Sequence, residues 1–165
     1  MAERADEGET LEGLLWEALE GRGVGYLGLT KSGLHPLPAV VFVDRRRRRL
    51  WLAAAADSEV VRSVGDGGAA IFTAQSPGLL ASVGGNLTIE DDPRRLARMW
   101  TPQAQAWRPE GPRDPGICLL CMDCVDAEVS LADSGLMRFS WDIVRPALRR
   151  RPRRPTAVAQ QPTLH

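Results

Sequence analysis

The chain has 165 residues, 44% of them hydrophobic and 25% charged, a balance that suits one globular domain and excludes wholesale disorder. Twenty-one acidic and 21 basic residues cancel to a formal net charge of zero, but the charges are segregated along the chain. Residues 1–20 hold seven acidic residues and one arginine, whereas residues 144–165 hold six arginines and no acid.

The first predicted element is a helix that begins after Thr10. Apolar residues recur there with the spacing of one helix face, at Leu11, Leu14, Leu15, Ala18 and Leu19. Thr10 suits the N-cap of this helix and Gly21 suits the position just past its C-terminus. Residues 1–9 are polar, and we expect them to be disordered.

After Gly23 the pattern changes to that of short strands. Segments rich in Val, Ile, Leu and small residues, separated by glycine, proline or charged clusters, predict six strands, at 24–30, 37–44, 50–56, 68–74, 79–90 and 117–131. Two short helices are expected between them, one over 58–64 and one that begins at Pro93. Four prolines between residues 101 and 115 predict a loop, and a last short helix is expected over 141–148.

Six strands with tight connections and helices at the periphery predict a mainly β fold, a small six-stranded antiparallel barrel. We expect this domain to span residues 10–148. Residues 149–165 have no core-forming pattern and predict a basic disordered tail. The sequence shows no secretory signal and no apolar run long enough for a bilayer, so a cytoplasmic protein without a membrane partner is expected.

Three cysteines form a C-x2-C-x2-C pattern at Cys118, Cys121 and Cys124, a spacing that occurs in zinc and iron–sulfur sites. A fourth thiolate is absent from the sequence, and successive side chains of a strand point to opposite faces. We therefore expect Cys118 and Cys124 on one face, Cys121 on the other, and no metal. His35 is the only internal histidine, so the sequence offers little for a Ser–His–Asp triad.

Two arginine-rich segments, residues 45–49 and the tail, suggest binding of a nucleic acid or another polyanion. A solvated hairpin tip and a polar tail explain the same pattern, and neither segment carries interleaved aromatic residues for base stacking. The tail could also pair with the acidic N-terminal helix, although exposed ion pairs are weak.

Four stretches carry a family resemblance: LHPLPAVVFVD, RLWLAAAADSEVV, LLASVGGNLTIEDDPRRLARMW and AWRPEGPRDPGICLL. They resemble the general stress protein branch of the pyridoxamine 5′-phosphate oxidase-like proteins. Order and spacing match the family most specifically at Trp100, Ala106, Trp107, Pro109, Gly111, Asp114, Pro115, Ala127 and Glu128. The resemblance covers roughly residues 10–130. It implies an FMN-binding split barrel, a homodimer, and a flavin in each cleft at the subunit interface.

The resemblance also indicates where a flavin phosphate would be held. The family has an arginine directly before a proline on the second strand, whereas this chain has Leu37 before Pro38. The family then reads Thr-x-x-x-Ser-x-Lys, whereas this chain has Ala54, Ser58 and Val60 at those positions. The candidate cofactor-binding residues are therefore Leu37, Pro38, Ala39, Ala54, Ser58, Val60 and Trp107.

Three functions follow as hypotheses. The first is an FMN-dependent oxidoreductase whose phosphate-binding positions have lost their cations. The second is a non-catalytic dimeric binding or stress-response module, because Leu37, Ala39, Ala54 and Val60 make the cleft more apolar. The third is a nucleic-acid or polyanion binder that acts through its arginines.

Overall fold

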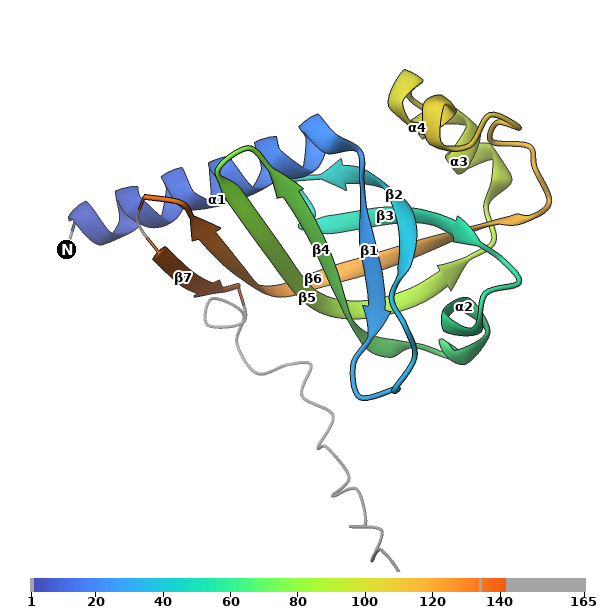
Figure 1. Cartoon of the computed structure of the whole chain (residues 1–165), viewed down its shortest axis with the longest axis horizontal. Helices are drawn as coiled ribbons and strands as arrows, with labels where there is room; N and C mark the ends of the chain where they lie inside the picture. The colour runs from blue at the N-terminus through green and yellow to red at the C-terminus, as the bar shows by residue number, and fades with distance from the viewer. Residues whose placement is uncertain (1, 134, 142–165) are drawn as a thin grey trace, which may run out of the picture.

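The computed structural model describes residues 2–133 and 135–141. Seven antiparallel strands form one sheet in the order β3-β2-β1-β4-β5-β6-β7, and an additional pairing of β3 with β6 closes the first six into a barrel (Figure 1). The strands are β1 (Val24–Leu29), β2 (Leu37–Asp44), β3 (Arg49–Ala55), β4 (Gly68–Ser76), β5 (Leu79–Glu90), β6 (Ile117–Leu131) and β7 (Gly135–Ser140). The predicted mainly β barrel and its six strands are confirmed.

The long strand β6 explains how a closed barrel carries a seventh strand. Its first half pairs with β3, from Ile117 to Asp123, and its second half pairs with β7, from Asp126 to Leu131. Strand β7 was not predicted. Its outward positions include the apolar, exposed Leu136, so the alternation of apolar and polar residues covers residues 137–140 alone, the lower limit of length for a strand signal.

Helix α1 spans Ala2–Arg22 and packs an apolar face against the barrel. The helix is longer at both ends than the sequence predicts: it begins within the segment expected to be disordered and continues past Gly21. Gly23, with a φ of 67°, is the residue that ends it, and its N–H donates to the Leu19 carbonyl at 3.1 Å.

Three short helices connect the strands: α2 (Glu59–Ser63), α3 (Pro93–Met99) and α4 (Pro102–Trp107). The first two were predicted, whereas α4 lies in the segment expected to be a loop. The Thr101 hydroxyl caps α4 by accepting from the Ala104 N–H at 3.1 Å, and Pro102 occupies its first turn. Two further predictions lie outside the described residues: the helix over 141–148, of which the structure describes residue 141 alone, and the disordered tail over 149–165.

The apolar interior has two parts. The main core fills the barrel and extends to α1, with Leu15, Leu27, Leu52, Phe72, Val83 and Leu120 among its fully buried side chains. A second cluster lies on the other face of β2, β3 and β6, where α3 and α4 cover it; it includes Phe42, Trp51, Leu96 and Ala104. The Arg95 guanidinium stacks over the Trp51 ring at 4.5 Å. The second core fixes α4 to the barrel.

One carboxylate ties the end of β7 to α1. Glu12 accepts from the indole N–H groups of Trp16 and Trp141, both at 3.1 Å, and lies 3.6 Å from the Arg48 guanidinium. The two indole rings are stacked with centroids 5.4 Å apart. Three segments remote in sequence therefore meet at Glu12. Among the described residues, no helix combines the length and the apolar character that crossing a bilayer requires.

Candidate functional site

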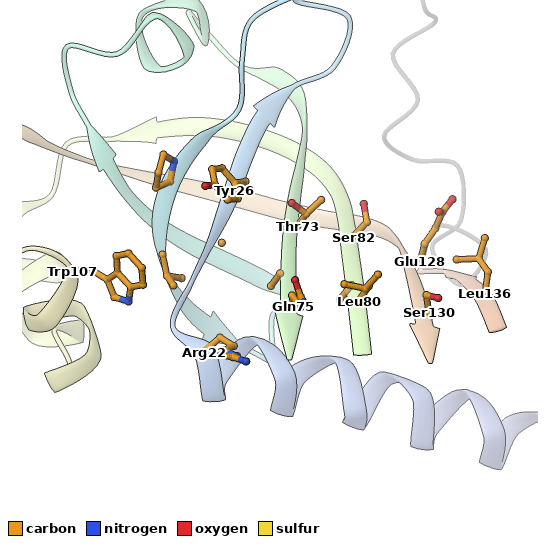
Figure 2. A pocket seen from close by; sticks show the side chains of 15 residues that line it. Arg22, Tyr26, Thr73, Gln75, Leu80, Ser82, Trp107, Glu128, Ser130 and Leu136 are labelled. Carbon is orange, nitrogen blue, oxygen red and sulfur yellow. The ribbon is translucent and has the colours of Figure 1, made fainter. Parts of the chain in front are cut away.

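A candidate site is a cleft of about 780 Å³ on the outer face of the sheet, between the end of α1 and α4 (Figure 2). This volume lies within the usual range of small-molecule pockets. Residues from six strands and two helices line the cleft: Arg22, Val24, Gly25, Tyr26, Pro38, Thr73, Ala74, Gln75, Leu80, Ala81, Ser82, Trp107, Glu128, Ser130 and Leu136.

Strand register explains how these residues meet. Tyr26 pairs with Thr73, Thr73 with Ser82, and Ser82 with Glu128, so one polar row crosses four neighbouring strands. All four side chains point away from the barrel interior, as Figure 2 shows. The Glu128 carboxylate is paired with Arg138 of β7 at 2.7 Å. The floor of the cleft therefore offers hydroxyl groups, while its one carboxylate is already neutralised.

Two aromatic rings stand beside this floor. Tyr26 and Trp107 are each 57% exposed, an unusual state for large aromatic side chains in a folded protein. Trp107 is the last residue of α4. Two hydrogen bonds of the Gln105 side chain fix the position of this helix: the amide accepts from the Trp100 indole N–H at 2.8 Å and donates to the Pro109 carbonyl at 2.7 Å. These hydrogen bonds connect α4 to the segments before and after it and thereby hold the Trp107 backbone in place.

The residues singled out from the sequence divide into two groups. Pro38 and Trp107 line the cleft. The other five lie elsewhere: Leu37, Ala39 and Ala54 pack in or against the barrel core, Val60 is 2% exposed, and Ser58 is the N-cap of α2.

The surroundings of α2 do not suit a phosphate dianion. The Ser58 hydroxyl already accepts from the Val61 N–H at 3.2 Å, and Glu59 brings a negative charge to the first turn. Leu37 and Val60 stand where the resembled family has cations, so the charge-assisted donors that a buried phosphate requires are missing. The FMN phosphate therefore does not fit at these positions.

Sequence reasoning missed most of the polar lining. Thr73, Gln75 and Ser82 lie at outward positions of β4 and β5, and only Glu128 belonged to the recognised family pattern. The alternation of apolar and polar residues over 72–75 was a usable signal for an exposed strand face. Arg22 carried no such signal, because its place depends on where α1 ends.

The cysteines occupy the faces that their spacing predicts. Cys118 and Cys124 pack with the barrel core, whereas Cys121 belongs to the second cluster. Burial raises the pKa of Cys121 to about 11 and that of Cys124 to about 12. These two thiols are therefore protonated and poorly nucleophilic near neutral pH. In the described part of the chain, no group of three or more His, Cys, Asp or Glu side chains is arranged to hold a metal ion.

Most arginines at the β2–β3 hairpin tip have acidic partners. Ion pairs join Arg45 to Glu20 at 2.8 Å, Arg47 to Asp44 at 3.1 Å, Arg48 to Glu12 at 3.6 Å and Arg49 to Asp123 at 2.8 Å. A polyanion would have to compete with these carboxylates, so the hairpin tip is a weaker phosphate-binding surface than its sequence indicates.

The family model described as "Pyridoxamine 5′-phosphate oxidase like" matches residues 11–152. Among solved structures, a general stress family protein from Xanthomonas campestris pv. campestris is 27% identical, with a TM-score of 0.63 and coverage of 78% of this chain and 92% of the other. The general stress FMN/FAD binding protein from Xanthomonas citri has the same identity, TM-score and coverage of this chain, with 94% of its own length matched.

A protein from Clostridium acetobutylicum related to general stress protein 26 is 15% identical and reaches a TM-score of 0.67, over 83% of this chain and 99% of its own. At this identity the likeness shows the fold alone. No curated protein matches the chain.

Proposed function

Since the chain belongs to the pyridoxamine 5′-phosphate oxidase-like family, we propose that its outer cleft binds a flavin and that the protein is a flavin-dependent oxidoreductase. The observation that carries this proposal is the cleft of about 780 Å³ beside the exposed rings of Tyr26 and Trp107. A planar isoalloxazine ring gains stabilisation from aromatic and apolar contacts. The FMN/FAD binding described for the Xanthomonas citri relative supports the same ligand class.

The residues of this chain would contribute binding and orientation. A bound flavin would supply the hydride or electron transfer. Leu80 and Leu136 offer apolar surface, while Thr73, Gln75 and Ser82 offer hydrogen bonds from neighbouring strands. These polar groups suit the polar edge of a ring whose other edge is apolar.

We further propose that the cleft is completed by a second copy of the chain. Tyr26, Ile71, Leu80, Trp107 and Leu136 are large apolar residues, all at least 41% exposed, and all but Ile71 line the cleft. Such a cluster on one sheet face is typical of an interaction surface, and a symmetric dimer would cover it with the same patch of its partner. Sedimentation analysis tests this proposal: Leu80→Arg should shift a dimer to monomer, and a monomeric wild-type protein would contradict it.

Flavin titration tests the binding proposal. The purified protein is titrated into FMN, FAD and riboflavin while flavin fluorescence is followed. Trp107→Ala should weaken flavin binding about tenfold or more, because it removes an aromatic contact surface. Ile89→Ala is a control, because Ile89 is also exposed on β5 but does not line the cleft. Failure of all three flavins to bind, or equal affinity of the wild type and the Trp107 variant, would contradict the proposal.

A non-catalytic binding module is the second candidate function. The observation that favours it is the burial of apolar residues at the family's phosphate positions, with Ala54 0% and Val60 2% exposed. Anaerobic addition of NADH or NADPH separates the two functions. Bleaching of the bound flavin spectrum supports an oxidoreductase. A bound flavin that no nicotinamide reduces, or a non-flavin ligand found by native mass spectrometry, supports the module.

A further inference from the structure

We propose that Arg22 binds the anionic group of the ligand in the cleft, so that this group lies at the α1 end and not beside α2. The inference rests on the proposed flavin binding and specifies how the ligand is oriented. It follows from the charges in the cleft, the placement of Arg22 and the chemistry of the opposite end.

Arg22 supplies the available positive charge of the cleft. Of the residues that line it, Arg22 and Glu128 alone are charged, and Glu128 is paired with Arg138 at 2.7 Å. Within residues 2–133 and 135–141, no ion pair involves the Arg22 guanidinium, in contrast to four of the five hairpin-tip arginines. Arginine keeps its charge at every physiological pH and can bind phosphate or carboxylate with two parallel hydrogen bonds.

The turn between α1 and β1 holds Arg22 at the rim of the cleft. Leu19, three residues earlier, is fully buried, and Gly23 directs the chain into β1 with its φ of 67°. A Cβ atom at Gly23 would lie 3.2 Å from Cβ of Gln103, so α4 packs tightly against this turn. The backbone of Arg22 is thereby fixed between the barrel and α4, although its side chain remains exposed.

Neighbouring polar groups extend the anion site along the sheet. Figure 2 shows Arg22 at the α1 end of the cleft, with Gln75 on the strand just beyond it and Tyr26 farther along β1. The Gln75 amide can donate a hydrogen bond to an oxyanion that Arg22 holds. A ring placed beside Tyr26 and Trp107 would therefore direct a charged substituent toward Arg22.

The α2 end of the barrel lacks the chemistry for the opposite orientation. Leu37 and Val60 carry no charge, and Glu59 in the first turn of α2 repels an anion. A ligand with its anion there would lose hydration without gaining charge-assisted donors. On α2 the charges of Glu59 and Arg62 balance each other, whereas Arg22 has no acidic partner among the described residues, and this difference in charge favours Arg22.

FMN and riboflavin provide the test, because they share the isoalloxazine ring and differ in the phosphate. Affinities of wild type, Arg22→Gln and Arg62→Gln are measured by flavin fluorescence at two KCl concentrations. Arg62 is an exposed arginine in the last turn of α2, so this control removes the same charge from the opposite end. Wild type should bind FMN about tenfold or more tighter than riboflavin, and added KCl should reduce this preference.

Arg22→Gln should abolish the preference for FMN and leave riboflavin affinity unchanged, whereas Arg62→Gln should change neither. Equal binding of FMN and riboflavin by wild type, or a preference that survives in Arg22→Gln or disappears in Arg62→Gln, overturns the assignment while leaving flavin binding intact. Absence of binding by both flavins overturns the assignment and the proposed function together.

Discussion

Two adjacent glycines at an irregularity between β5 and β6 should respond very differently to substitution by alanine. Gly84 is paired with Asp126 and Gly85 with Cys124, so the register shifts between them and β6 carries one extra residue. A Cβ atom at Gly85 would clash with the carbonyl oxygen of Asp123 and would lie 2.9 Å from Cγ of Met122. At Gly84 the clash is with the carboxylate of Asp126.

The nature of the clashing atoms sets the magnitude. The Asp123 carbonyl belongs to the backbone of β6 and Met122 is 0% exposed, so relief at Gly85 requires movement of a barrel strand. Overpacking of this kind costs about 1–3 kcal/mol, and we expect Gly85→Ala to fall near the upper end. The Asp126 side chain is exposed and can rotate away from a new methyl group. Replacing a strand glycine also gains about 0.5–1 kcal/mol, so Gly84→Ala should be nearly neutral.

Urea unfolding of wild type and both variants, followed by circular dichroism, measures the two free energies of unfolding. We expect a loss of about 2–3 kcal/mol for Gly85→Ala and a change within about 0.5 kcal/mol for Gly84→Ala. The pair controls for glycine removal itself, because both variants make the same chemical change in the same strand. Equal losses, or a neutral Gly85 variant, would refute the reasoning from the close approach of β6.

Three further predictions concern stability and reactivity. Glu12→Gln removes the charged acceptor of two indole N–H groups, so it should lower the free energy of unfolding in urea by about 1–3 kcal/mol and change the tryptophan emission spectrum. An unchanged free energy of unfolding would contradict this role of Glu12. Because burial raises the pKa values of Cys121 and Cys124 to about 11 and about 12 from an ordinary value near 9, the unfolded chain loses these protons first. The free energy of unfolding should then fall as pH rises from about 9 towards 11, and substitution of both cysteines by alanine should flatten that dependence. Ser58→Ala removes the α2 N-cap and should cost about 1 kcal/mol, whereas Ser58→Asp, which keeps an acceptor, should cost less.

Local patterns in the sequence were enough to predict the barrel strands but not every peripheral element. The four prolines at 102, 109, 112 and 115 predict a loop over residues 101–115, although Thr101 followed by Pro102 is also a normal start for a short helix. The sequence does not predict strand β7, because the apolar residue Leu136 faces outward into the cleft instead of into the core. Its strand conformation depends on its pairing with β6, which the local sequence does not show.

The cleft depends on registers that a single sequence does not define. Tyr26, Thr73 and Ser82 become neighbours through two strand pairings, and a slip of one residue in either would turn a side chain to the opposite face. Arg22 shows the same dependence at a helix end. Had α1 ended before Gly21 as predicted, Arg22 would have been a linker residue instead of the last residue of the helix.

The apolar residues at the family's phosphate positions also affect the stability of the ligand-free barrel. Cations grouped in a cleft repel one another and lose hydration until an anion arrives, so they reduce the stability of the empty protein. Leu37, Ala54 and Val60 instead bury apolar surface whether or not a ligand is present. The barrel therefore gains stability at the α2 end without a ligand, and ligand-dependent stabilisation must come from the outer cleft. With FMN as the ligand, the increase in melting temperature should accordingly be smaller in Trp107→Ala and Arg22→Gln than in the wild type and unchanged in Arg62→Gln.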